Sequence, residues 1–203
     1  MPGRQVLTAE QARAIHVDPG YFKDCSDAIL MTTRGGDQYE RAIMDGFLTP
    51  GVGPENWVSR TNYPALNVIP TGPAEMSFFV NQDYGQPTSH LRRYSLRLDG
   101  FTAVKAPYEG GEVLTKPFTF AGKELAINFA TSAAGGILVE VQDEGGTPLP
   151  GFTEADAVET IGNEIERPVR WKSGTDVAAL AGRPVRLRFV MCDARLYAFQ
   201  FRP

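Results

Sequence analysis

The second half of the chain alternates apolar and polar residues with a period of two, and this pattern limits the possible fold more than any other feature. The alternating segments are 125–130, 137–142, 185–191 and 197–202. Successive side chains of a strand point to opposite faces, so the alternation predicts strands with one buried face and one face in water. The turn-forming clusters that separate the strands are 121–123, 134–136, 144–146 and 173–175. This spacing is typical of an antiparallel sandwich.

Helical signals are few and short. Thr8 followed by Gln11 predicts a capping box and a helix over 9–15, ended by the turn at 18–20. A second helix is predicted over 176–181, ended by Gly182. With 21 glycines and 15 prolines in 203 residues, turns outweigh helices, and we expect an all-β chain.

The first half also contains strand patterns, in a different arrangement. Residues 28–33 form a continuous apolar run, which predicts a strand buried on both faces. A second strand, over 75–80, begins with Glu75, and a partner strand follows over 94–98. Each of the two strands is opened by a carboxylate and followed by a hairpin partner. This arrangement is similar to successive blades of a propeller.

Charge and segment patterns exclude several classes of function. The formal net charge of -4 disfavours binding to nucleic acid or to an anionic membrane. No run approaches the ~20 apolar residues of a membrane span, and no apolar stretch of a signal peptide follows Met1. Cys25 and Cys192 lack metal-site spacing, so we expect two buried thiols, no metal and no other cofactor. The cellular compartment stays open.

Several motifs together resemble a known family. They are Ser26–Gly36, Thr71–Glu75, Arg92–Phe101, Val141–Asp143, Val169–Lys172 and Leu180–Phe189. They resemble the last part of the β-propeller, and the β-sandwich that follows it, in bacterial proteins labelled glycosyl hydrolase of the invertase/levanase and arabinanase type. The resemblance implies a partial β-propeller-like part over 1–104 and an antiparallel, jelly-roll-like β-sandwich over 105–203. It also implies a secreted or periplasmic protein.

The acid-bearing motifs of that family are missing from the sequence. It contains neither Asp-Pro-Asn nor Arg-Asp-Pro, and Asp24-Cys25 is not the Glu-Cys pair of the family. The resemblance therefore implies a carbohydrate-binding or accessory module that lacks the usual catalytic acids. Its expected partners are oligosaccharides or polysaccharides and a catalytic propeller domain.

A catalytic alternative stays open. Glycoside hydrolysis needs two carboxyl groups on either side of the bond, one of them with a raised pKa. Asp27 and Glu75 each open a predicted strand and would share a rim, and His90 lies in a polar loop nearby. The chain would then be a small hydrolase that uses Asp27, Glu75 and His90. The structural alternative is that both carboxylates bind backbone amides or pair with arginines.

Sugar binding without chemistry requires exposed aromatic faces beside planar polar groups. The residues in predicted loops or strand starts that fit this requirement are Trp57, Arg60, Asn62, Tyr63, Tyr84 and Arg92. Trp171 shares a strand face with Val169, so we expect it in the core. A third hypothesis is structural: unpaired strand edges in an open blade invite pairing with a second copy.

Overall fold

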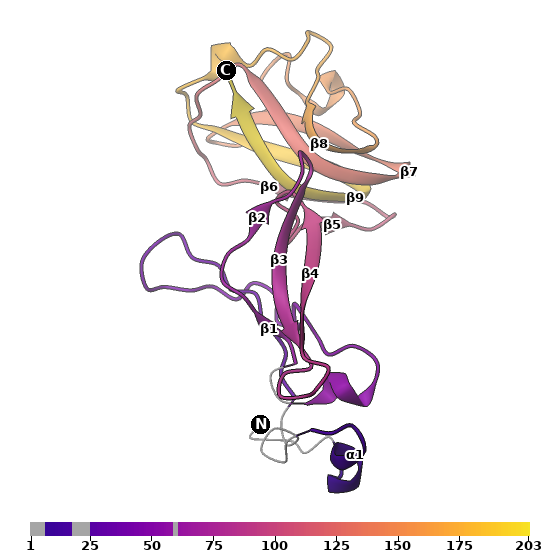
Figure 1. Ribbon diagram of the computed structural model, residues 1–203. Coiled ribbons are helices and arrows are strands. Elements are labelled where there is room, and N and C mark those ends of the chain that lie inside the picture. Colours follow the sequence, from indigo (N-terminus) through magenta and orange to yellow (C-terminus); the bar gives the residue numbers. More distant parts are fainter. Residues whose placement is uncertain (1–6, 18–24, 59–60) are drawn as a thin grey trace. The chain divides into compact units, whose positions relative to one another are not determined.

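The computed structural model describes residues 7–17, 25–58 and 61–203. The chain divides into two compact units, Met1–Leu96 and Arg97–Pro203, which we call the N-terminal unit and the C-terminal unit. Strands dominate, and they form two sheets (Figure 1). The expectation of an all-β chain is confirmed, while the domain boundary after residue 104 stays a prediction.

The helical elements are short, and one differs from the expectation. Helix α1 spans Ala9–Ala14 and begins with the predicted capping box, in which Thr8 Oγ1 accepts from Gln11 N at 3.1 Å. The turn expected at 18–20 lies outside the described residues. The expected helix over 176–181 is only the 3₁₀ helix η3, Ala178–Leu180. Two further 3₁₀ helices are η1, Pro54–Trp57, and η2, Glu154–Asp156.

Strand β3, Glu75–Gln82, organises the sheet of the N-terminal unit. Strands β1, Tyr63–Pro64, and β2, Ile69–Pro70, pair antiparallel with β3, and β4, His90–Arg97, pairs with it as well. The strand expected over 75–80 is confirmed. Its partner begins at His90, four residues before the expected start at 94, so His90 lies in a strand and not in the preceding loop.

The expected strand over 28–33, buried on both faces, is wrong. The segment makes only isolated bridges, Ala28 with Leu48 and Thr32 with Glu40. Ile29 and Met31 are each 47% exposed. Within the described part of the chain no second layer covers this run, so its apolar sequence does not produce burial.

The C-terminal unit holds one five-stranded sheet, in the order β5-β9-β7-β8, with β6 paired to β9. Its strands are β5 Val104–Ala106, β6 Gly111–Leu114, β7 Glu124–Asp143, β8 Asn163–Pro168 and β9 Val185–Arg202. The separate strands expected on either side of the cluster at 134–136 are therefore one strand, β7. The segments 185–191 and 197–202 likewise belong to the single strand β9, which lies beside β7 (Figure 1).

A sharp bend replaces the turn that we expected at 134–136. Residues 132–135 of β7 face only Asp193 of β9, because Thr131 pairs with Ala194 and Gly136 pairs with Cys192. Asp193 takes the left-handed conformation, with a φ of 38°. Such extra residues bend a strand and increase its twist without ending the ladder. The sheet therefore doubles over at this point.

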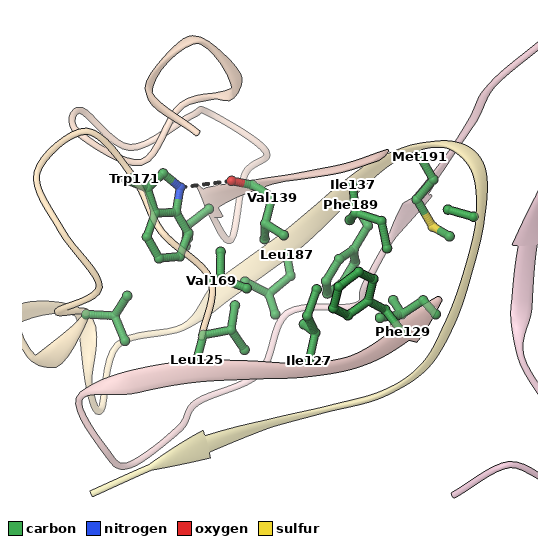
Figure 2. Close-up of a cluster of buried hydrophobic side chains, with 14 of the residues drawn as sticks. Leu125, Ile127, Phe129, Ile137, Val139, Val169, Trp171, Leu187, Phe189 and Met191 are labelled. Atoms are coloured by element: carbon green, nitrogen blue, oxygen red, sulfur yellow. Dashed lines mark hydrogen bonds between the residues drawn. The ribbon is translucent and has the colours of Figure 1, made fainter. Parts of the chain in front are cut away.

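The doubled sheet encloses one core. Figure 2 shows Leu125, Ile127 and Phe129 of one half of β7 facing the side chains of the other half and of β9. The buried residues on the facing side are Ile137, Val139, Leu187, Phe189 and Met191. The inward residues of 125–130, 137–142 and 185–191 are thus as predicted. The expectation for 197–202 is wrong in part, because Leu196 is buried whereas Tyr197 is the extra residue of a bulge and Phe199 is 38% exposed.

Trp171 closes the edge of this core. It is 2% exposed, and its indole Nε1 donates to Val139 O at 2.8 Å (Figure 2). Its ring meets that of Phe152 edge-on. A buried indole needs such an acceptor, because an unpaired N–H costs free energy in an apolar interior. The expectation that Val169 and Trp171 belong to the core is confirmed.

The opposite face of β7 is not the wet face that alternation predicts. Ala126, Asn128, Glu140 and Gln142 are all buried. The amide of Asn128 donates to Leu98 O, and the carboxylate of Glu140 accepts from the backbone N–H of Glu154. Segments outside the ladder therefore cover the strand, and they satisfy polar groups that would otherwise face water.

Gly135 at the bend provides a test of this geometry. A Cβ at this position would lie 2.5 Å from the carbonyl oxygens of both Cys192 and Asp193. We expect Gly135→Ala to lower the free energy of unfolding by about 1–3 kcal/mol, the usual cost of overpacking. Urea denaturation followed by circular dichroism measures this. Gly111→Ala is the control, because its Cβ would meet Ala106 at an ordinary 3.7 Å. Equal losses in both variants would contradict the bend.

Candidate functional site

The β3–β4 hairpin places Glu75 and His90 at opposite ends. Glu75 opens β3 and His90 opens β4, and the short connection 83–89 permits only an antiparallel return. At ~3.3 Å per residue, the two ends of the 8-residue β3 lie roughly 23 Å apart. Glycosidase carboxyl groups lie within about 10 Å of each other. The structure does not bring Glu75 and His90 into one catalytic group.

Asp27 lies toward the His90 end of the hairpin. The carbonyl of its neighbour Ser26 accepts a hydrogen bond from Asn62 Nδ2 at 3.0 Å. Tyr63, which follows Asn62 in the chain, pairs with Asn81 near the end of β3. Asp27 itself is exposed. The structure therefore does not bring Asp27 and Glu75 to a shared rim.

The environment of Glu75 favours its anionic form. A hydrogen bond from Thr71 Oγ1 at 2.7 Å, together with the nearby Arg93 guanidinium, holds the pKa of Glu75 below its ordinary value. A general acid requires the opposite, a raised pKa. This arrangement matches the structural alternative, in which the carboxylate pairs with an arginine.

Aromatic and polar groups gather where β3 ends and β4 begins. We call this region the aromatic end and define it by Trp57, Tyr63, Asn81, Asp83 and His90. Trp57 is 44% exposed and Tyr63 58% exposed. The side chain of Asn81 leaves its Oδ1 without a hydrogen bond within the described ranges. His90 Nδ1 lies 2.9 Å from Thr88 O and 3.9 Å from Asp83 Oδ2.

Local hydrogen bonds hold the aromatic end in place. The side-chain amide of Gln86, in the hairpin loop, donates to Glu55 O at 2.6 Å and so ties η1 to the end of β3. Trp57 Nε1 donates to Gly51 O at 3.0 Å. Because the indole N–H is satisfied within the chain, the exposed part of Trp57 offers chiefly its apolar ring.

The other expected sugar-binding residues differ in their exposure to solvent. Asn62 is only 4% exposed and uses its amide to hold Ser26 O, so its position is structural. Tyr84 is half-buried beside Asp83, and Arg92 is exposed on β4. Arg60 lies outside the described residues. Trp57 and Tyr63 thus remain the members with exposed aromatic surface.

Asp83 is a residue of this region that was not among the expected binding or catalytic residues. It is 6% exposed and takes a left-handed conformation, with a φ of 54°. Asp tolerates this conformation better than most residues, which makes it common in turns. The signal in the sequence was the turn-like Asp83-Tyr84-Gly85 directly after a strand, and only the fold shows that His90 returns beside it.

The C-terminal unit contains a separate cluster of charges around Arg188. Its guanidinium lies 2.7 Å from Glu112, 2.8 Å from Glu154 and 3.6 Å from Glu140. These residues come from β9, β6, η2 and β7, so the cluster ties together four elements. Alternation predicted that Arg188 faces outward. It did not predict the partners of Arg188, because these lie far away in sequence.

Glu140 is the buried member of this cluster, with 5% exposure. Burial alone would raise the pKa of its carboxyl group. Hydrogen bonds from Gln142 and from the backbone N–H of Glu154, together with the charge of Arg188, outweigh burial and hold the pKa below its ordinary value of 4.5.

This pKa shift predicts a dependence of stability on pH. Because the folded pKa of Glu140 lies below its unfolded value, its contribution is complete above about pH 4.5 and is lost as pH falls through the folded pKa. We expect the difference in unfolding free energy between wild type and Glu140→Gln to shrink as pH falls from 6 to 3. Denaturant unfolding across this range measures it. The exposed Glu159→Gln serves as control, and a difference that grows toward acid would contradict the account.

A cavity of about 430 Å³ opens next to this cluster. Glu109, Glu112 and Glu159 line it together with the apolar side chains of Leu138 and Val190, and its lining includes no basic side chain. The carboxylates disfavour phosphates and acidic sugars as ligands of this cavity.

Within residues 7–17, 25–58 and 61–203, no group of three or more His, Cys, Asp or Glu side chains is arranged to hold a metal ion. No described helix combines the length and apolar character needed to cross a membrane. Cys25 and Cys192 are free but half-buried, so the expectation of two fully buried thiols is wrong. Burial, with the nearby Asp27 charge, raises the pKa of the Cys25 thiol.

Comparison with known proteins finds no match for this chain. No protein-family model matches it, and neither a curated protein nor a solved structure shows significant similarity.

Proposed function

We propose that this chain is a carbohydrate-binding accessory module that acts beside a glycoside hydrolase. In this proposal the N-terminal unit derives from a β-propeller, and the C-terminal unit is a jelly-roll-like β-sandwich. The aromatic end binds a neutral oligosaccharide or polysaccharide. A binding role requires no pair of catalytic carboxyl groups, and the separation of Glu75 from Asp27 and His90 supports binding over hydrolysis.

The observation that carries the proposal is the exposure of two aromatic rings beside polar side chains. Trp57 and Tyr63 are 44% and 58% exposed at the end of the hairpin that also holds Asn81 and His90. A sugar ring has an apolar C–H face and a rim of hydroxyl groups. Aromatic faces pack against the C–H face, and amide and imidazole groups form hydrogen bonds with the hydroxyl groups.

Titration of the full chain with neutral oligosaccharides and polysaccharides tests the proposal. We expect Trp57→Ala and Tyr63→Ala each to weaken binding about tenfold, which corresponds to about 1.4 kcal/mol. Tyr39→Ala is the matched control, because Tyr39 is a 61% exposed tyrosine of the same unit outside the aromatic end. Isothermal titration calorimetry measures all three. Failure of every neutral glycan to bind, or an equal loss in Tyr39→Ala, would contradict the proposal.

A further inference from the structure

The cavity of about 430 Å³ in the C-terminal unit lies on the face of the sheet that points away from the core. Three strands run side by side there: Glu112 of β6 pairs with Val190 of β9, and Val190 pairs with Leu138 of β7. The neighbours of Val190 along β9, Phe189 and Met191, belong to the core. Because successive side chains alternate between the two faces, Glu112, Val190 and Leu138 form one row across the outer face.

Glu159 completes this row beyond β7. Ile137 forms an antiparallel bridge with Thr160, so the residue after Ile137 lies opposite the residue before Thr160. Glu159 therefore stands opposite Leu138. Its carboxylate leans over β7, because Glu159 Oε1 occupies the place where a side chain on Gly136 would begin. Gly136 also lines the cavity, so this carboxylate forms part of the cavity wall.

The floor between the walls is apolar and hollowed. Val190 and Leu138 are half-buried and give it an aliphatic surface. Beside them Gly136 pairs with Cys192, and this pair leaves space that larger side chains would fill. At about 4.8 Å between neighbouring strands, β6 and β7 lie roughly 10 Å apart, with β9 between them. The volume falls within the ~300–1,000 Å³ typical of ligand pockets.

The carboxylates of the walls are not balanced by cations. Glu109 and Glu112 lie on the β6 side and Glu159 on the β7 side, and the lining includes no basic side chain. Arg188, in the next row, lies 2.7 Å from Glu112, so that charge has a partner. Within the described part of the chain, Glu109 and Glu159 have neither an ion pair nor a side-chain hydrogen bond. Two negative charges therefore remain on opposite sides of an apolar floor.

This arrangement selects a ligand with a positive charge at each end and an apolar middle. A single metal ion does not suit it, because metal ions bind oxygen at about 2–2.6 Å and the walls stand too far apart. A quaternary ammonium group favours aromatic faces, and the lining includes no aromatic side chain. Primary ammonium groups form charge-assisted hydrogen bonds with carboxylates, and a methylene chain packs on aliphatic side chains.

We propose that this cavity binds an aliphatic diammonium ion. One ammonium group pairs with Glu159, the other pairs with Glu109 beside Glu112, and the methylene chain lies on Val190 and Leu138. Once one end is bound, the second end pairs at a high effective concentration, so a diamine binds more tightly than a monoamine. The inference does not depend on the proposed function, because the cavity shares no residue with the aromatic end.

A series of diamines of different chain length tests the inference on the full chain. The probes are diaminopropane, putrescine, cadaverine, diaminohexane and diaminooctane, with butylamine as the singly charged counterpart of putrescine. Isothermal titration calorimetry at low salt, where screening is weak, should show an affinity that passes through a maximum in the series. The best diamine should bind at least tenfold more tightly than butylamine. Chemical-shift mapping of the ¹⁵N-labelled chain should place saturable shifts at the backbone amides of 110–112, 136–138 and 190–192.

Glu159→Gln and Glu109→Gln each remove one charge and keep the size of the side chain. We expect each to weaken the best diamine about tenfold, because one of its two ion pairs is lost. Glu144→Gln is the matched control, since Glu144 is an exposed carboxylate of the same unit outside the cavity. It should leave the affinity unchanged. Circular dichroism confirms that each variant is folded.

The outcomes separate this inference from the proposed function. A diamine affinity no higher than that of butylamine overturns the diammonium site, and so does an equal loss in Glu144→Gln. Shifts spread over acidic residues outside the cavity also overturn it, because they show attraction to the acidic surface in general. If diamines bind as expected while no neutral glycan binds the aromatic end, the diammonium site stands and the proposed function fails.

Discussion

The doubling of the β7–β9 ladder is the constraint on which the C-terminal unit depends. One pair of long strands supplies both layers of the core, so Leu125, Ile127 and Phe129 pack against residues of the same two strands farther along. The bend requires a residue without a side chain at Gly135, where backbone carbonyls approach closely. Trp171 then seals the edge. Burial of this single cluster supplies the hydrophobic stabilisation of the unit.

The N-terminal unit has a smaller cluster of buried apolar side chains than the C-terminal unit. Its described core cluster consists of Leu7, Ala12, Val17 and Val58, while Met44 and Leu66 are 72% and 91% exposed. A unit with little buried surface relies on local hydrogen bonds and turns to hold its shape. Those same bonds fix the aromatic end and leave its rings free to contact a ligand, which connects the weak core to the proposed binding role.

The sequence predicted those structural features that depend on the spacing of neighbouring side chains. The capping box at Thr8, the inward residues of β7 and the burial of Trp171 follow from side-chain spacing, and all are observed. The continuity of β7 was not predictable, because a glycine pair at a bend looks like one at a turn. Trp57 and Tyr63 were found by composition, whereas the place of Asp83 beside His90 and the burial of Asn128 depend on contacts distant in sequence.

Native-state hydrogen exchange tests the doubled sheet most directly. If both halves of β7 pack into one core, the backbone amides of 125–129 and 137–141 must open in the same cooperative event. The account predicts equal opening free energies for the slowest amides of the two halves, and a parallel decrease in both when Gly135 is replaced by Ala. Exchange of one half through an independent, lower-energy opening, with the other half still protected, would contradict it.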